Sequence, residues 1–248
     1  MITKQSARRT SATAKRVLQQ LGHDRRSVAL MLVVPAVLLI LFKYVYTGNA
    51  ALFDQIGPQL LGIFPFIIMF LVTSVTMVRE RTSGTLERLL TTPLARGELI
   101  GGYAFAFGST ALLQSVVTTA VALGPLSMKV NSVWVIAVFA IVDALLGTAL
   151  GLLMSAFART EFQAVQFMPA IVLPQLLLCG LLNPRPEMAA VLRWISNVLP
   201  LSYVTDAFTR ARTVQGLDAQ MWRDLAILAG CLILALGLAS TTLRRRTP

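Results

Sequence analysis

Six long apolar runs, separated by polar stretches, constrain this chain more than any other feature of its sequence. A helix needs about 20 residues to cross the roughly 30 Å of hydrocarbon in a bilayer. The runs are about that long and lie at residues 28–46, 57–78, 99–123, 133–157, 162–182 and 225–243. They are continuously apolar, whereas strands of a membrane barrel would alternate over about ten residues. The sequence therefore predicts an all-α integral membrane protein with six transmembrane helices in a single domain, residues 1–248.

The charge of the chain is explained by this topology. The sequence has 22 Lys and Arg against 11 Asp and Glu, a net charge of +11, which alone could indicate a nucleic-acid-binding protein. In membrane proteins, however, Lys and Arg gather in cytoplasmic segments. With both termini in the cytoplasm, 15 of the 22 fall inside and all three Trp residues fall near the outer interface. We expect a multi-pass protein of the cytoplasmic (plasma) membrane, with both termini cytoplasmic and no nucleic-acid partner.

Residues 1–27 precede the first span and are predicted to form an amphipathic helix. Apolar side chains recur there at helical spacing, at Ala14, Val17, Leu18 and Leu21. Such a helix lies on the membrane surface with its apolar face toward the acyl chains. A secretory signal peptide also places a basic region before an apolar one, but this basic region is too long and five further apolar runs follow.

The segment before the last span, residues 183–224, is too polar for a comfortable seventh span. A turn at Asn183–Pro186 is followed by apolar residues at helical spacing. These are Met188, Val191, Leu192, Ile195 and Leu199. We expect a short, partly re-entrant helix in the outer leaflet, a depth at which such backbone is tolerated only where protein or a water-filled cavity surrounds it.

Charges, a glycine and a proline crowd together in the connector between the second and third runs, VRERTSGTLERLLTTPLARGELIGGY (residues 78–103). Arg79, Glu80 and Arg81 cannot stay in hydrocarbon and end the second span. Gly84 can then adopt the conformation that breaks the helix.

A second, short helix is predicted within this connector. It begins near Thr85 and places Glu87 in its first turn, where a carboxylate favours the positive helix end. Thr92–Pro93 ends it. The product is an amphipathic helix roughly parallel to the membrane and attached to spans two and three. The alternative is a solvated loop that joins two spans.

The connector resembles the corresponding segment of the ABC type-2 permeases, including the daunorubicin-resistance and multidrug exporters. In that family a Glu-Arg pair, then Gly-Thr, Glu, Leu and Pro mark a coupling helix between spans two and three. The coupling residues that the resemblance implies here are Glu80, Arg81, Gly84, Thr85, Glu87, Arg88, Leu89 and Pro93. The outer segment is also similar to the family's segment before the last span. The positions that carry this second similarity are Asn183, Pro184, Met188, Trp194, Pro200 and Tyr203.

The resemblance implies a non-catalytic permease subunit. The sequence contains no G-x-x-x-x-G-K-[ST] phosphate-binding loop, so ATP and Mg are expected on a partner chain, a P-loop ATPase present in two copies. The ATPase would grip the coupling helix and contact the cytoplasmic turn Ala158–Glu161. A second permease copy, identical or related, would complete the exporter. We expect no catalytic residue, cofactor or metal site in this chain.

A substrate path between the two copies, lined by spans two and five, also follows from the resemblance. The candidate residues are Phe66, Phe70, Thr73 and Met77 on span two, and Phe167 and Gln175 on span five. Ordinary packing between spans is the alternative for each of them. A cavity of Phe, Met and amide side chains would suit a hydrophobic or amphipathic substrate such as a drug or a lipid.

Asp143, near the middle of the fourth span, is a candidate functional residue because intramembrane carboxylates are costly. It shares a face with Gly147, Gly151 and Ser155, and this spacing of four is typical of closely packed helices. We expect Asp143 to form a hydrogen bond across a helix pair. A proton relay or a substrate contact is the alternative.

Two other classes of function are weaker. An ion- or proton-coupled secondary transporter could work around Asp143, but no pair of interrupted spans occupies matching halves of the chain. A membrane-embedded enzyme would need clustered polar catalytic residues at one depth, and His23, Asp143 and the scattered serines do not form such a group.

Overall fold

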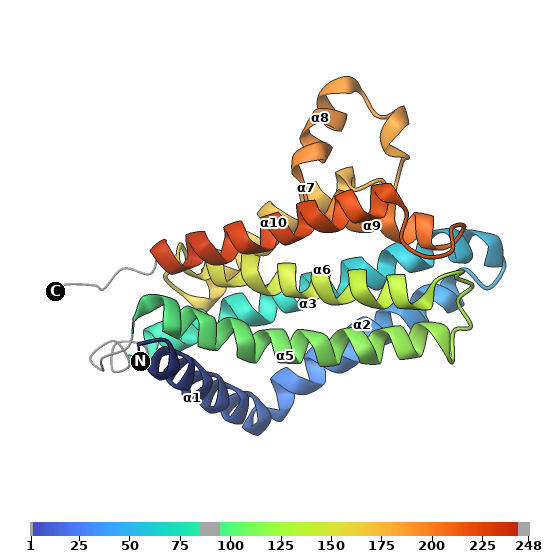
Figure 1. The fold of residues 1–248 in the computed structure, drawn as a ribbon. Coiled ribbons are helices and arrows are strands. Elements are labelled where there is room, and N and C mark those ends of the chain that lie inside the picture. Colours follow the sequence, from blue (N-terminus) through green and yellow to red (C-terminus); the bar gives the residue numbers. More distant parts are fainter. Residues whose placement is uncertain (1, 85–94, 243–248) are drawn as a thin grey trace.

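The computed structural model describes residues 2–84 and 95–242, and these ranges contain helices and no strand. Long helices run side by side in an elongated bundle (Figure 1). Six helices in these ranges are long and apolar enough to cross a membrane. They are α2 (Arg25–Val45), α3 (Ala50–Thr82), α5 (Arg96–Leu123), α6 (Val133–Ser155), α7 (Glu161–Leu178) and α10 (Ala219–Thr242). The predicted all-helical membrane protein with six transmembrane helices is confirmed.

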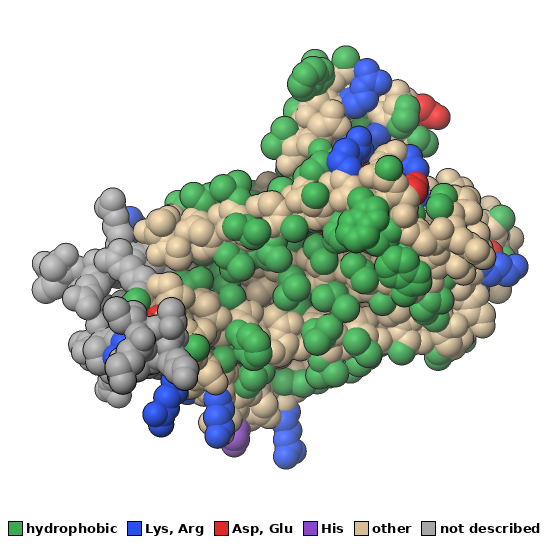
Figure 2. Space-filling model, in the orientation of Figure 1, with side chains coloured by type: hydrophobic (Ala, Val, Ile, Leu, Met, Phe, Trp, Pro, Cys, Tyr) green, Lys and Arg blue, Asp and Glu red, His purple; other side chains and the backbone are tan. Residues whose placement is uncertain are grey.

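The two ends of the bundle differ. At one end, here called the α1 end, α1 (Ile2–His23) lies beside the last turn of α3 and the first turns of α5. Toward the opposite end, here called the α8 end, η1 (Arg185–Glu187) and α8 (Ala190–Val198) project from the side of the bundle, and α9 (Leu201–Ala211) lies at their base (Figure 1). Figure 2 shows hydrophobic side chains over the middle of the bundle and basic side chains toward its ends. This distribution fits a bundle with an apolar layer between two polar ends.

The α3 helix is longer than the predicted span 57–78. It begins after Asn49, whose side chain accepts a hydrogen bond from the Leu52 amide at 3.2 Å, and it continues to Thr82. At 1.5 Å per residue its 33 residues cover about 50 Å, more than the roughly 30 Å of hydrocarbon. The prediction was short because it followed apolarity, whereas the polar residues at both ends are helical too. The charges at the end of α3 therefore stand on regular helix.

Close contact between α3 and α6 forms the centre of the bundle. A Cβ atom on Gly147 would lie 2.5 Å from the Phe66 carbonyl oxygen, and one on Gly151 would lie 2.6 Å from the Phe70 carbonyl oxygen. Real Cβ atoms do not approach oxygen so closely, so only glycine fits at these two positions. The predicted packing face on the fourth span is confirmed.

The apolar face of α1 packs on protein. Ala14, Val17 and Leu21 are all at most 4% exposed, and they belong to a hydrophobic cluster with Leu99 and Tyr103 of α5. The expectation that these three residues meet the acyl chains was therefore wrong. These residues of α1 are buried against α5 because Gly102 of α5 lets the two helices approach closely.

The outer segment is divided between two helices with opposite exposure. In α8, Val191, Trp194 and Val198 are exposed, and this helix stands off the bundle (Figure 1). In α9, Leu201 and Phe208 are fully buried, and the Phe208 ring lies 2.5 Å from where a Gly62 Cβ would be. Of the two helices, α9 is the one that packs into the bundle. Entry of this segment into the outer leaflet stays a prediction.

The glycine contact gives a first testable prediction. Gly147→Ala should lower the free energy of unfolding by about 1–3 kcal/mol, because the new methyl group must displace the backbone of α3. The measurement is unfolding of the purified chain in mixed micelles. The matched control is Gly230→Ala on α10, where no atom of the described ranges outside the nearby backbone of α10 and the two chain neighbours lies within 4 Å of the position that a Cβ would take. Equal stability of the two variants would contradict the packing account.

Candidate functional site

Three consecutive charged residues end α3 and reach three different neighbours. Successive residues on a helix point about 100° apart, because a turn takes 3.6 residues. Arg79, Glu80 and Arg81 therefore cannot share one partner. Each of them contacts a separate part of the α1 end, as follows.

Glu80 joins α3 to α1 and α5. Its Oε2 atom accepts a hydrogen bond from Tyr103 Oη at 2.8 Å and one from Arg16 Nη2 at 3.3 Å. Arg16 Nη2 also donates to Tyr103 Oη at 2.7 Å, and its guanidinium carbon lies 5.9 Å from the centre of the Tyr103 ring. The Glu80 side chain is only 11% exposed. Charge-assisted hydrogen bonds in such shielded positions are stronger than neutral ones, so this triad fixes α1 on the bundle.

Arg81 joins α3 to the end of α6. Its Nη1 atom donates to the Ser155 carbonyl oxygen in a short contact and approaches the Ala158 carbonyl oxygen at 3.5 Å. The last carbonyl groups of a helix have no partner within the helix and carry its negative end. The guanidinium therefore both satisfies these oxygens and stabilises the end of α6.

Arg79 joins α3 to the start of α7. Its Nε and Nη2 atoms each donate to one carboxylate oxygen of Glu161 at 3.0 Å, and Nη1 lies 3.9 Å from Asp24 Oδ2. Arg79 is half exposed, so this pair stabilises the fold little, although its two-pronged geometry defines an orientation. The turn Ala158–Glu161, predicted to touch an ATPase, thus lies directly beside the end of α3.

Gly84 ends this arrangement with a backbone angle φ of +72°, a conformation that glycine adopts without steric cost. The predicted helix break at Gly84 is confirmed. The described chain resumes before α5, where the Ala95 amide donates to Glu98 Oε2 at 3.0 Å. The remaining predicted coupling residues lie outside the described residues, and the coupling helix stays a prediction. These residues are Thr85, Glu87, Arg88, Leu89 and Pro93.

Comparison with known families agrees with this geometry. Residues 8–211, most of the chain, match the ABC-2 type transporter family. The chain belongs to this family. The match includes the charged end of α3, the turn after α6 and all of α9.

Several curated proteins are similar to this ABC-2 chain. "ABC transporter G family member 20" of Dictyostelium discoideum is 24% identical over 64% of the chain and 22% of its own length. Two Escherichia coli proteins are each named "probable multidrug ABC transporter permease". YbhR is 29% identical over 60% of the chain and 41% of its own length. YbhS is 26% identical over 81% of the chain and 54% of its own length. The chain thus spans about half the length of these relatives or less.

The predicted pathway residues of the ABC-2 chain are buried within it. The four on α3 are fully buried: these are Phe66, Phe70, Thr73 and Met77. On α7, Gln175 is buried and donates to the Ile171 carbonyl oxygen of its own helix at 3.2 Å. Phe167 is half-buried beside Val78 and Ala158. A substrate path along these residues stays a prediction.

Sequence reasoning missed Arg185, which organises the α8 end. Its guanidinium donates to Asp206 and to the Asn197 side chain, both at short range, and lies 5.5 Å from the Tyr203 ring centre. Tyr203 Oη donates to the Asn197 carbonyl oxygen. Burial raises the pKa of Asp206, and Arg185 opposes this shift. The only sequence signal was an arginine held between Pro184 and Pro186.

The other predicted residues of the outer segment occupy turns and surfaces around this cluster. Pro184 precedes η1, and Pro200 precedes α9. Asn183 and Trp194 are exposed, whereas Met188 is half-buried. Their part in transport stays a prediction.

Asp143 lies fully buried on α6, and neither carboxylate oxygen has a hydrogen-bond partner among the residues that the structure describes. The expected hydrogen bond across the helix pair was therefore wrong. On this face of α6 the structure places backbone carbonyl groups of α3, those of Phe66 and Phe70, opposite Gly147 and Gly151. An ionised carboxylate accepts hydrogen bonds and donates none, so such carbonyl groups cannot be its partners.

The triad at the end of α3 gives a second prediction. Tyr103→Phe removes one hydroxyl and should lower the free energy of unfolding by about 1–3 kcal/mol, since it leaves buried charged partners less satisfied. Glu80→Gln should cost a similar amount. The double variant should lose less stability than the sum of the two single losses, by about 0.5–3 kcal/mol, because both substitutions act on one network. Strictly additive losses in micelle unfolding would contradict the triad.

Proposed function

We propose that this chain is the membrane-spanning permease subunit of an ATP-binding-cassette exporter. It would move a hydrophobic or amphipathic substrate, such as a drug or a lipid, outward across the membrane. Energy would come from ATP and Mg bound to a separate P-loop ATPase, present in two copies. The α1 end would face the cytoplasm, together with both termini.

The observation that carries this proposal is the set of contacts that Arg79, Glu80 and Arg81 make between the end of α3 and its neighbours. The connector 85–94 leaves α3 at Gly84 and enters α5 after Ala95. A partner that displaced this connector would pull on both helices at once. Through the three charged contacts the same displacement would reach α1, the end of α6 and the start of α7. One docking point could thus move the whole α1 end.

The family and the names of the relatives support export and a permease role. A second permease copy would complete the path, and the apolar surface of α7 offers it a face. Phe162, Leu173 and Leu177 on this helix are exposed in the single chain. Because α7 also carries Phe167 and Gln175, a copy placed against it would bring these residues close to the shared interface.

A proton- or ion-coupled secondary transporter is the second candidate, and the burial of Asp143 favours it. A buried carboxyl group without a hydrogen-bond partner is costly, and in membrane proteins such groups often belong to ion pathways. In this alternative, transport would need Asp143 and no nucleotide.

Association with the ATPase gives the third prediction. The chain would be co-expressed with a P-loop ATPase encoded in the adjacent reading frame. Glu87→Arg should reduce co-purification of the ATPase at least tenfold, about 1.4 kcal/mol of binding energy, with the membrane level unchanged. Glu187→Arg at the α8 end makes the same charge change and should leave co-purification intact. Loss in both variants, or in neither, would contradict the coupling assignment.

The fourth prediction separates the two candidate functions. In proteoliposomes that contain the ATPase, Asp143→Asn should preserve ATP-dependent transport of a hydrophobic dye to within about threefold. The substitution keeps the size of the side chain and removes only a titratable group that the ATP-driven account does not use. The opposite result would be dye transport that proceeds without ATP and that Asp143→Asn abolishes. It would establish the secondary transporter.

A further inference from the structure

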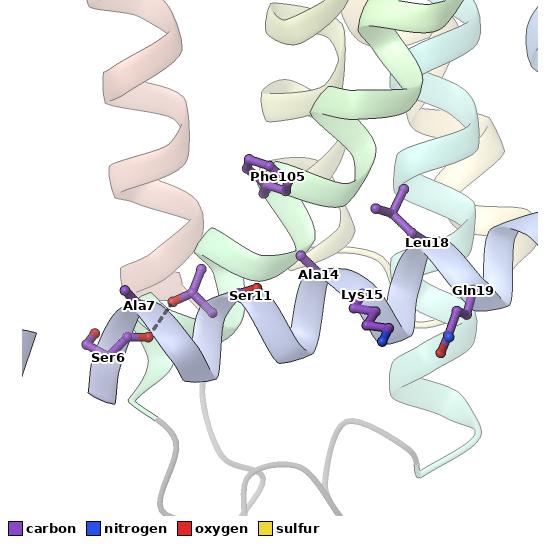
Figure 3. Close-up of a pocket in the computed structure, with 9 residues that line it drawn as sticks. Ser6, Ala7, Ser11, Ala14, Lys15, Leu18, Gln19 and Phe105 are labelled. Atoms are coloured by element: carbon purple, nitrogen blue, oxygen red, sulfur yellow. Dashed lines mark hydrogen bonds between the residues drawn. The ribbon is translucent and has the colours of Figure 1, made fainter. Parts of the chain in front are cut away.

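A groove opens between α1 and α5 at the α1 end of the bundle (Figure 3). Its volume is about 840 Å³. One wall is a stripe of α1 that includes Ala7, Ser11, Ala14, Lys15 and Leu18, and the other is the ring of Phe105 on α5. No part of the transport account uses this groove.

The groove lies next to the closest approach of α1 and α5. A Cβ atom on Gly102 would lie 2.6 Å from Thr13 Cβ, so the two backbones meet there. Beside Phe105, α1 presents the small side chains of Ala7, Ser11 and Ala14. These are too short to fill the space beside Phe105, which is left 65% exposed.

The lining of the groove is amphipathic. Phe105, Ala14 and Leu18 form an apolar floor, and Phe105 belongs to a helix that crosses the membrane. Lys15 supplies an exposed positive charge that extends from α1 on the side away from Phe105 (Figure 3), and Ser11 supplies a hydroxyl group. The sequence of residues 1–23 contains no Asp or Glu. An occupant should therefore combine an apolar chain with an anionic head.

We propose that the groove binds an anionic phospholipid from the membrane leaflet beside α1. One acyl chain lies against Phe105 and Leu18, and the phosphate meets the Lys15 ammonium group. Juxtamembrane basic residues attract anionic lipids in this way. A lipid also fits the place of the groove, because its apolar wall is an exposed part of a transmembrane helix. This proposal goes beyond the exporter function and needs neither the ATPase nor transport.

The test uses a fluorescent reporter inside the groove. Phe105→Trp is introduced into the full chain after Trp134, Trp194 and Trp222 are replaced by Phe. The protein is reconstituted in phosphatidylcholine vesicles with brominated phosphatidylglycerol or, separately, brominated phosphatidylcholine, both of which quench a tryptophan that they touch. We expect brominated phosphatidylglycerol to quench more strongly at equal content.

Charge variants locate the headgroup. Lys15→Gln should lower the preference for phosphatidylglycerol about fivefold, the loss expected for one basic residue near an anionic surface. Arg8→Gln removes the same charge from an exposed position of α1 outside the groove, and its effect should be less than half as large. Native mass spectrometry can count the phosphatidylglycerol molecules that stay bound to each charge variant in a chain that keeps its own tryptophans. Lys15→Gln should again lose more bound lipid than Arg8→Gln.

Three results would overturn the proposal. Equal quenching by the two lipids would mean that the groove meets only bulk lipid. Absence of quenching by either would mean that protein covers the groove. Equal effects of Lys15→Gln and Arg8→Gln, in quenching and in native mass spectrometry, would mean that α1 attracts anionic lipid as a whole and has no site.

Discussion

The cost of a charge in hydrocarbon governs the α1 end of this protein. Three charged residues follow directly on a transmembrane helix, and α3 has to extend beyond the apolar layer to carry them into a polar environment. Because the three side chains point in different directions around the helix, each of them contacts a different neighbour. Glu80 binds Arg16 and Tyr103, Arg81 binds the end of α6, and Arg79 binds Glu161. A membrane span thereby becomes the common support of α1, α5, α6 and α7.

Tight packing makes this support stiff along its length. At Gly147 and Gly151 the backbone of α6 rests on the carbonyl groups of α3, and at Gly62 the buried helix α9 rests on α3 from another side. Interiors packed this closely shift between discrete arrangements more readily than they deform. A displacement at the charged end of α3 would therefore be passed to the α8 end, where Arg185 binds Asp206 and Asn197.

Prediction from sequence succeeded where one short pattern was enough. Continuous apolarity placed the spans, the four-residue spacing of Gly147 and Gly151 located the closest contact, and Gly84 marked the end of α3. It failed where the answer depended on residues far apart in the chain. Arg16 and Glu80 are 64 positions apart, and no local pattern connects them. The burial of α9 was also missed, because its sequence contains polar residues. One of them, Thr205, donates a hydrogen bond to the Cys179 carbonyl oxygen, and no pattern within α9 reveals this partner.

The claim that the α1 end moves as one unit can be measured directly by distances between spin labels. Labels would be placed at exposed positions on α3 (Thr82), α1 (Ala12) and the turn after α6 (Arg159), in a chain whose Cys179 and Cys231 are replaced by serine. In the proposed complex with an ATPase and a second permease copy, the three distances should stay constant when ATP binds, while each label moves relative to the second copy. A change in the distances from Thr82 to Ala12 or Arg159 would contradict the account.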